Sequence, residues 1–311
     1  MSQYRFLHSK HINPEKWDAC ISASTDFPYP LFWYLDAVTQ QSWSALVLRD
    51  YEAVFPITWK NTFGVRHVYQ PFFCQQLGLF SPESHPQFEI SCLRFLQRKY
   101  FFSEINLHYK SFAENSKQIS IRQNFVLPLN ADYENLQAQY SKNTSRNLSK
   151  SLAHNLHLQK FEDVSKFVKM YAETSGNNTK GYKDKHNGIL EKLIREATER
   201  GYGEVVAAFS NTSDNPVAAC FMLIIGNRII NIAPVTASDA RDTGGMTFLL
   251  DSYIKRFAQS DKVLDFEGSS VENIARFYKG FGAKPQPFWQ YKHTVWDVLK
   301  QPFLFSSSHY K

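Results

Sequence analysis

Residues Leu264–Ala283, which read LDFEGSSVENIARFYKGFGA, constrain the fold of this chain more than any other stretch. The run Val263–Glu267 is apolar with carboxylates at alternate positions, and this pattern predicts a strand. After a break at Gly268, apolar residues return at helical spacing, so a helix is expected to end at Gly280 or Gly282. The sequence therefore predicts a strand that leads directly into a helix.

The junction between this strand and this helix suits ligand binding. Ser269 or Ser270 is the expected N-cap, and free amides at a helix start favour an anion or a ligand carbonyl. The phenol of Tyr278 follows one to two turns later, so we predict a transfer site here. The alternative is an ordinary strand–helix unit in which Tyr278 packs in the core.

The same block resembles the last conserved block of the GNAT acyltransferase superfamily, which has Asn, then Ala, then Tyr-x-x-x-Gly-Phe. In this chain Asn273, Ala275, Tyr278 and Gly282 take the first four places, and Ala283 stands where the family usually has Phe. Asn273 also lies closer to the tyrosine than in the common pattern. The order Phe-Tyr-Lys-Gly-Phe-Gly is similar to the Fem-type branch, the bacterial peptidoglycan-bridge aminoacyltransferases.

This resemblance implies roles for two of the residues. Acyl transfer to an amine needs a deprotonated amine, a stabilised oxyanion and a proton for the leaving group. Tyr278 matches the tyrosine that serves many GNAT enzymes as general acid. Lys279 is similar to a Fem-type lysine and is expected to bind a phosphate of the substrate.

A carboxylate is the second predicted catalytic group. Asp265 and Glu267 alternate on the predicted strand, so they face opposite sides and only one can face a cleft. We favour Glu267, because it lies at the strand's end beside the break, as a base or as the group that binds the acceptor's ammonium. The alternative is a capping or ion-pair residue.

A second diagnostic stretch, Ala237–Leu250, reads ASDARDTGGMTFLL. It resembles the GNAT loop Arg/Gln-x-x-Gly-x-Gly/Ala, which binds the coenzyme A pyrophosphate through bare amides, small residues and a helix N-terminus. Met246 departs from this pattern, and the Fem-type branch tolerates degenerate loops because its donor is an aminoacyl-tRNA. The alternative is a glycine-containing helix start without a ligand. The predicted donor-binding residues are Arg241, Thr243, Gly244, Gly245 and Asn273.

Charge is unevenly distributed before this loop. No acidic residue occurs from Asn135 to Phe161, and Lys142, Arg146 and Lys150 are spaced four apart, so they share one face of a helix. Such a stripe can bind phosphates of a tRNA, a nucleotide-linked sugar or a lipid headgroup, and Fem-type proteins have a comparable helix. The alternative is a solvated helix face.

The two halves of the chain show a similar order of predicted elements. A chain of 311 residues exceeds a comfortable single core, so two domains are expected. The turn signal after residue 129 marks the boundary, which predicts domains at 1–130 and 131–311. The second half is expected to run helix 134–154, strand 156–161, helices 164–172 and 188–199, strands 205–209, 217–225 and 229–235, helix 244–258, strand 263–267 and helix 271–281.

This order resembles the GNAT domain, and the first half resembles a degenerate copy of it. Tandem GNAT domains are the arrangement of the Fem-type enzymes. We therefore predict an α/β (α+β) fold of two tandem GNAT-like domains, each with a mixed, mostly antiparallel central sheet flanked by helices. The second domain is expected to carry the site.

Composition narrows the protein class. An apolar share of 43% favours a globular protein, and a net charge of +6 favours partners that carry negative charge. The start is too polar for a signal peptide, and Val217–Gly226, the longest apolar run, is too short to span a bilayer, so a cytoplasmic location is expected. No Ser-His-Asp set, zinc-ligand spacing or P-loop occurs. Buried free thiols are expected at Cys20, Cys74, Cys92 and Cys220.

The predicted function is an acyltransferase that moves an aminoacyl or acyl group onto an amine acceptor, with no tightly bound cofactor. The donor is expected to be aminoacyl-tRNA or acyl-CoA, and the acceptor a small molecule or a cell-wall precursor; no DNA partner is expected. The first alternative is an acetyl- or acyl-CoA-dependent N-acyltransferase. The second, from another class, is a non-catalytic module that binds a phosphorylated ligand or a protein.

Overall fold

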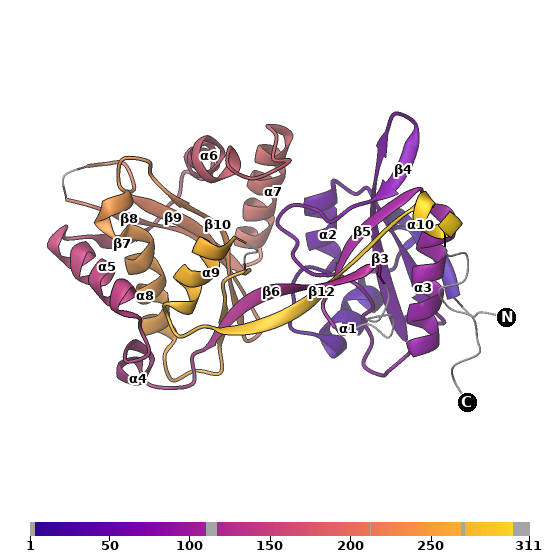
Figure 1. The fold of residues 1–311 in the computed structure, drawn as a ribbon, viewed down its shortest axis with the longest axis horizontal. Helices are drawn as coiled ribbons and strands as arrows, with labels where there is room; N and C mark the ends of the chain where they lie inside the picture. Colours follow the sequence, from indigo (N-terminus) through magenta and orange to yellow (C-terminus); the bar gives the residue numbers. More distant parts are fainter. Residues whose placement is uncertain (1–3, 110–116, 212, 269–270, 301–311) are drawn as a thin grey trace. The chain divides into compact units, whose positions relative to one another are not determined.

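Two structural units make up the chain in the computed structural model, which describes residues 4–109, 117–211, 213–268 and 271–300 (Figure 1). Unit 1 comprises Met1–Arg122 with Pro287–Lys311, and unit 2 comprises Gln123–Gln286. The chain thus passes between the units twice, in strands β6 (Ile119–Pro128) and β12 (Lys284–Thr294). The domain limits 1–130 and 131–311 follow the order of elements in the sequence and stay a prediction.

Unit 1 has a sheet whose strands pair in the order β1-β2-β3-β4-β5-β12. All of these pairs are antiparallel except β4 with β5, which is parallel. The strands are β1 (Tyr4–His8), β2 (Trp43–Leu48), β3 (Ala53–Thr62), β4 (Val65–Val68) and β5 (Phe102–Leu107), with β12 from the C-terminal part. The helices are α1 (Pro14–Ser24), α2 (Phe32–Thr39), α3 (Pro86–Lys99), α10 (Val295–Lys300) and the 3-10 turn η1 (Ser9–His11).

Helices cover both faces of this sheet. The Phe6 ring contacts Phe95 of α3 at 5.2 Å between ring centroids, and the Trp43 ring contacts Trp17 of α1 at 5.0 Å. Phe6 pairs with Leu46, and side chains alternate along β2, so Trp43 lies on the face opposite to Phe6. Unit 1 therefore has a helix–sheet–helix layering.

Unit 2 repeats this plan with the strand order β6-β11-β10-β9-β8-β7, in which only β10 and β11 pair in parallel. The strands are β7 (His157–Lys160), β8 (Gly203–Phe209), β9 (Ala218–Ile225), β10 (Arg228–Thr236) and β11 (Val263–Asp265), with β6. The helices are α4 (Tyr133–Gln137), α5 (Lys142–Ala153), α6 (Val164–Tyr171), α7 (Lys185–Glu199), α8 (Gly245–Phe257) and α9 (Glu272–Lys279), with the turns η2 (Ala172–Gly176) and η3 (Arg241–Thr243).

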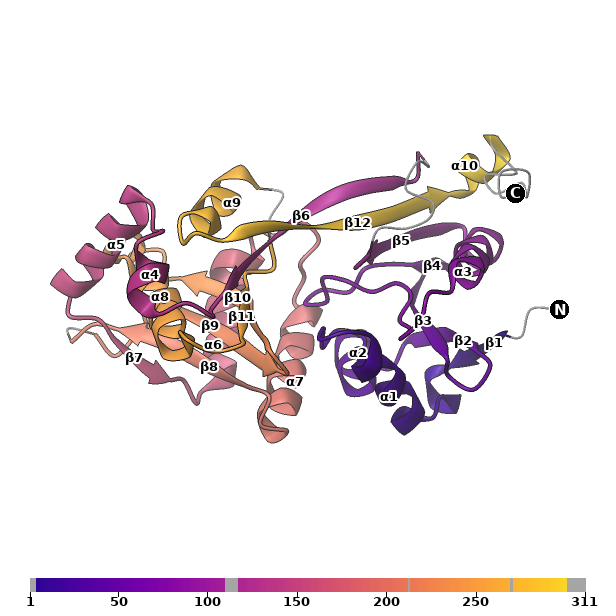
Figure 2. The same cartoon turned by 90° about the horizontal axis from the view of Figure 1, so that it is seen from below.

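The core of unit 2 lies between the sheet and helices α8 and α9. Its buried cluster joins Leu249 and Tyr253 of α8 to Met222 of β9, Ile229 of β10 and Tyr278 of α9. In Figures 1 and 2, α5, α8 and α9 lie on this side of the sheet of unit 2, and α6 and α7 lie on the other. Strand β9 reads AACFMLII because both of its faces are covered.

The structure corrects three local expectations. The single helix predicted at 134–154 is two helices, because Ser141 caps α5: its side chain accepts a hydrogen bond from the amide of Thr144. The strand predicted at 263–267 ends at Asp265. The N-cap position of α9 is Val271, without a side-chain cap, and the serines expected there, 269 and 270, lie outside the described residues.

The first prediction concerns His108, a buried histidine in unit 1. The His108 ring stacks on Phe80 with 4.4 Å between centroids, and burial lowers its pKa to about 4. Between pH 6.5 and 4 the His108 ring is therefore protonated in the unfolded chain and neutral in the folded chain. The free energy of unfolding consequently decreases as the pH is lowered through this window, by up to about 1.4 kcal/mol per pH unit. Urea unfolding at several pH values should show a shallower fall in His108→Phe than in wild type.

The control for this measurement is His154→Gln, which replaces an exposed histidine. An unaltered profile in His108→Phe would contradict the assignment.

Candidate active site

Strands β10 and β11 of unit 2 part soon after they meet. Their parallel pairing ends at Ile230 with Asp265. Strand β11 cannot continue, because Glu267 and Gly268 take left-handed conformations with φ of 54° and 32°. A Cβ at Gly268 would lie 2.3 Å from the Cα of Asn124, so only glycine allows the backbone to turn away this close to β6.

Strand β10 has its own irregularity at the same level. Its register with β9 shifts between Ile232 and Val235, and Ala233 has a φ of 52°. Pro234 has no amide hydrogen to donate to the ladder, so the bulge leaves the backbone of this segment outside the regular pairing. Pro234 in an otherwise apolar strand was the sequence signal for this bulge.

A buried ion pair joins the strands just before they part. The guanidinium of Arg228 donates to the Asp265 carboxylate at 2.8 Å, and both side chains are almost fully buried. Asn124 of β6 and the backbone amide of Glu267 also donate to this carboxylate, at 2.9 and 2.8 Å. Burial raises the pKa of Asp265, and the Arg228 charge opposes that rise. Asp265 is thus a structural residue that fixes the turn holding Glu267.

The turn after α6 reaches the bulge from the other side of the sheet. Residues Ala172–Gly176 form a single π-type turn, a form that often marks functional sites. The Ser175 hydroxyl donates to the carbonyl of Pro234 at 3.0 Å. This turn holds Tyr171, which is buried and hydrogen-bonded to Thr179. The sequence predicted helices over 164–172 and 188–199 and did not indicate a role for Tyr171.

Tyr171, Glu267 and Tyr278 converge at this place. Burial, followed by the Glu267 charge, raises the pKa of Tyr278 well above its usual value. Burial raises the pKa of Tyr171 to about 12, and the Glu267 charge acts in the same direction. One carboxylate thus acts electrostatically on both phenols. Both phenols keep their protons at neutral pH, and the Tyr278 ring stacks on Phe266 at 4.8 Å.

A buried amide on β10 belongs to the same region. Asn231 is 1% exposed, and neither its Oδ1 nor its Nδ2 has a hydrogen-bond partner among the described residues. Alternation along β10 places it on the face of Ile229, which belongs to the same core cluster as Phe266 and Tyr278. Its cross-strand partner Met222 lies in that cluster too. The sequence signal was a single polar residue inside an apolar run.

Gly244 and Gly245 of the predicted donor loop lie so close to neighbouring residues that a side chain at either position would clash. A Cβ at Gly244, where φ is 76°, would lie 2.1 Å from the carbonyl oxygen of Asn147 in α5. A Cβ at Gly245 would lie 2.8 Å from Val217, and its amide donates to Thr243 at 3.2 Å. Local packing therefore accounts for both glycines. The side chain of Met246 is partly buried and packs against the core cluster of unit 2.

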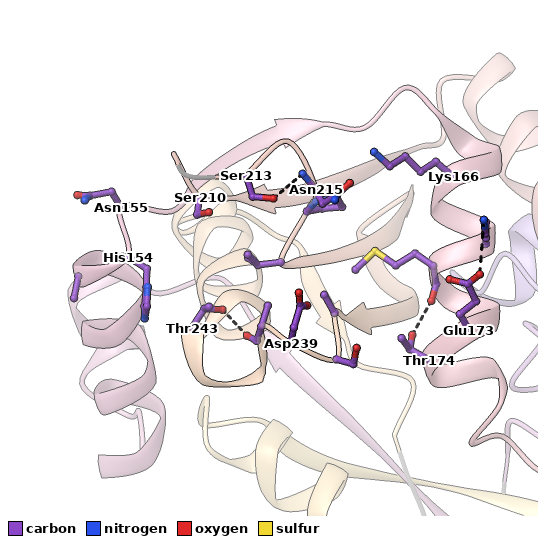
Figure 3. A pocket seen from close by; sticks show the side chains of 18 residues that line it. His154, Asn155, Lys166, Glu173, Thr174, Ser210, Ser213, Asn215, Asp239 and Thr243 are labelled. Carbon is purple, nitrogen blue, oxygen red and sulfur yellow. Dashed lines mark hydrogen bonds and ion pairs between the residues drawn. The ribbon is translucent and has the colours of Figure 1, made fainter.

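A hollow of ≈ 840 Å³ opens beside this loop (Figure 3). Its walls come from the end of α5, from α6, from the β8–β9 connection and from residues 237–243. His154, Lys166, Asp239 and Thr243 are among the side chains that line it. Arg241 is exposed on η3 and is not among the lining residues of this hollow. Polar and charged groups thus surround a space large enough for part of a substrate.

The predicted basic residues lie on the surface of unit 2. Lys142, Arg146 and Lys150 are exposed on α5, and Lys150 is 4.0 Å from Asp242. A second hollow of ≈ 750 Å³ lies where the start of α5 meets α9. Lys279 and Asn273 both line this second hollow. Thr243, which was predicted to bind the donor together with Asn273, lines the first hollow instead. The residues lining the second hollow are Ser141, Asn143, Thr144, Asn273, Arg276, Phe277, Lys279 and Gly280.

Comparison with known proteins identifies the fold. No family model matches the chain, and no curated protein matches it. Among solved structures, FemX superposes with a TM-score of 0.64 at 11% identity over 96% of this chain and 100% of FemX. The C-terminal domain of a putative lysylphosphatidylglycerol synthetase from Agrobacterium fabrum gives 0.57 at 11% identity, covering 96% of this chain and 98% of that domain.

A tandem GNAT protein from the clavulanic acid biosynthesis pathway gives a TM-score of 0.56 at 10% identity, over 94% of this chain and 98% of that one. The chain therefore has the fold of the tandem GNAT proteins, with a Fem-like resemblance, and the predicted fold class is confirmed. Within the described residues, no helix combines the length and the apolar character that crossing a membrane requires. The four cysteines are buried and free, as expected.

The second prediction concerns Asn231, whose side-chain amide has no hydrogen-bond partner among the described residues. A buried amide without partners costs stability, and leucine has the same branched shape without polar atoms. Asn231→Leu should therefore unfold at the wild-type temperature or a few degrees higher, as measured by thermal denaturation.

Asn124→Leu is the matched control for this substitution. It removes a buried amide that donates to Asp265 and should cost about 3 kcal/mol. If Asn231→Leu were destabilised as strongly as Asn124→Leu, the Asn231 amide would have a structural role in the folded chain.

Proposed function

We propose that this chain is an aminoacyltransferase, which moves an aminoacyl group from an aminoacyl-tRNA onto an amine acceptor in unit 2. The observation that carries the proposal is that the Glu267 carboxylate, which follows the end of the β10–β11 pairing, acts electrostatically on the buried phenols of Tyr171 and Tyr278. A carboxylate and a protonated phenol are the pair of groups that aminolysis of an ester requires.

Each group has a step in this reaction. The acceptor nitrogen attacks the ester carbonyl carbon, forming the C–N bond, while the Glu267 carboxylate takes a proton from that nitrogen. The C–O bond to the tRNA ribose then breaks, and the Tyr278 hydroxyl gives its proton to the leaving oxygen. The raised pKa of Tyr278 keeps that proton available at neutral pH. The proton taken by Glu267 returns to the tyrosine at the end of the cycle.

Asn231 supplies the oxyanion contact in this proposal. Its Nδ2 donates to the carbonyl oxygen, on which negative charge develops when the amine attacks. Its Oδ1 accepts a hydrogen bond from the α-amino group of the donor. The observation behind this assignment is that both atoms are buried and unpartnered among the described residues.

The surroundings of the glycine loop support aminoacyl-tRNA over acyl-CoA as the donor. A pyrophosphate cradle needs open space above bare amides, whereas Gly244 faces a carbonyl of α5 and the Gly245 amide is bonded to Thr243. The exposed cations Lys142, Arg146 and Lys150 suit an RNA backbone. The acceptor in this proposal is an amine of a small molecule or a cell-wall precursor, and the location is cytoplasmic.

The third prediction concerns the donor. Wild-type protein should release amino acid from charged tRNA faster than the uncatalysed ester hydrolyses, and Tyr278→Phe should slow this release by about 10²-fold or more. Acetyl-CoA at micromolar concentration should leave the melting temperature unchanged. The measurements are loss of acid-precipitable labelled amino acid and a thermal-shift titration.

Three results would count against this proposal. Stabilisation by micromolar acetyl-CoA would favour an acyl-CoA-dependent N-acyltransferase. Full activity of Tyr278→Phe would remove Tyr278 from the mechanism, and the absence of any turnover would favour a binding module. The control variant is Phe95→Tyr in unit 1. It adds one hydroxyl at a residue distant in sequence from Tyr278, so it tests for effects of expression and purification.

The fourth prediction concerns the stripe on α5. Changing Lys142, Arg146 and Lys150 together to Glu should weaken tRNA binding at least about tenfold and flatten its dependence on salt, because fewer counterions are released. Filter binding over a range of salt concentrations measures both effects. The control changes three exposed lysines by the same total charge: Lys180 and Lys183 of the α6–α7 connection and Lys185 at the start of α7. Equal weakening in both variants would mean that net charge alone sets the affinity.

A further inference from the structure

The hairpin of β3 and β4 in unit 1 ends in an exposed apolar tip. The two strands pair from Trp59 with Val68 to Thr62 with Val65. The turn between them is Phe63-Gly64, with φ of 51° and 82°. Such turns favour Asn-Gly, and a bulky residue at positive φ is strained.

The Phe63 side chain contributes nothing to the folded core of its unit. It is 101% exposed, and the neighbouring Val65 is 47% exposed. A phenylalanine that strains the turn and contacts no core residue lowers the stability of the isolated chain. Its exposure is therefore best explained by a partner that removes it from water.

Cations and aromatic rings lie directly behind this tip. The Arg66 guanidinium lies over the Trp59 ring at 4.9 Å, and the Lys60 ammonium lies over the Tyr69 ring at 4.7 Å. The hairpin thus has an apolar tip, a basic collar and a pair of aromatic rings in that order.

We propose that the β3–β4 hairpin docks on an anionic lipid surface. Phe63 and Val65 enter the boundary between headgroups and acyl chains, Lys60 and Arg66 bind headgroup phosphates, and Trp59 and Tyr69 lie at headgroup level. This order of apolar, cationic and aromatic groups matches the layers of a membrane interface.

The small size of the tip favours a lipid surface over a protein partner. One phenylalanine and one valine cannot form the core of a stable protein interface, which buries roughly 800 Å² on each side. A lipid surface needs no matching pocket, and it combines a short apolar insertion with charge attraction to give reversible binding. The proposal rests on unit 1 alone and is independent of the reaction assigned to unit 2.

Vesicle sedimentation of the full chain tests this proposal. Wild-type protein should sediment with vesicles of phosphatidylcholine mixed with phosphatidylglycerol at low salt and stay in solution with phosphatidylcholine alone. Phe63→Asn suits the left-handed turn, so it should melt at or above the wild-type temperature, yet it should partition about tenfold more weakly. Arg66→Glu should weaken binding to the anionic vesicles.

A matched control and a labelled variant complete the test. Phe101 is 54% exposed in the same unit, and Phe101→Ser should bind as wild type. Phe63→Cys can carry an environment-sensitive dye, because the four native cysteines are buried, and its emission should shift to the blue on anionic vesicles. Wild-type binding by Phe63→Asn, equal binding to neutral vesicles, no sedimentation at all, or an unshifted dye would each overturn the proposal.

Discussion

The ion pair between Arg228 and Asp265 determines the geometry of unit 2 around the candidate site. Strand β11 is only three residues long, so backbone pairing alone gives it little hold on the sheet. The buried carboxylate of Asp265 binds Arg228 of β10, Asn124 of β6 and the amide of Glu267. One side chain thereby connects both neighbouring strands to the turn that presents Glu267.

A buried ion pair of this kind gives position more than stability. Taking two charges out of water costs nearly as much as their attraction returns, but removing one partner leaves an uncompensated charge. The Asp265 carboxylate is satisfied by donors from three directions, so the turn can adopt left-handed φ at Glu267 and Gly268. The parting of β10 and β11, and with it the convergence at Tyr278, depends on this arrangement.

Local sequence patterns predicted most of the elements and part of the site. The strands of unit 2 predicted at 205–209, 217–225 and 229–235 and the strand–helix block were visible as periodic apolar positions and turn residues. Tyr278 and Glu267 were chosen from that block, and the Glu267 charge acts on the buried Tyr278 phenol, but their catalytic roles stay a prediction. These features depend on residues close together in the sequence.

The remaining site residues depend on contacts between distant segments. Tyr171 reaches the site through a π-type turn that has no sequence pattern of its own. Gly244 resembled a phosphate-binding glycine, but its close neighbour is the Asn147 carbonyl, nearly a hundred residues earlier in the chain. Asn231 became a candidate site residue only from its burial and from the lack of hydrogen-bond partners for its side chain among the described residues. A single sequence carries no signal for such contacts.

The most direct test of this account is a crystal structure with a non-hydrolysable aminoacyl-adenosine, in which an amide replaces the ester. We expect the acyl carbonyl oxygen about 3 Å from Nδ2 of Asn231, with the ribose facing the Tyr278 hydroxyl. A ligand bound away from these two side chains, with the Asn231 amide still unpartnered, would contradict it.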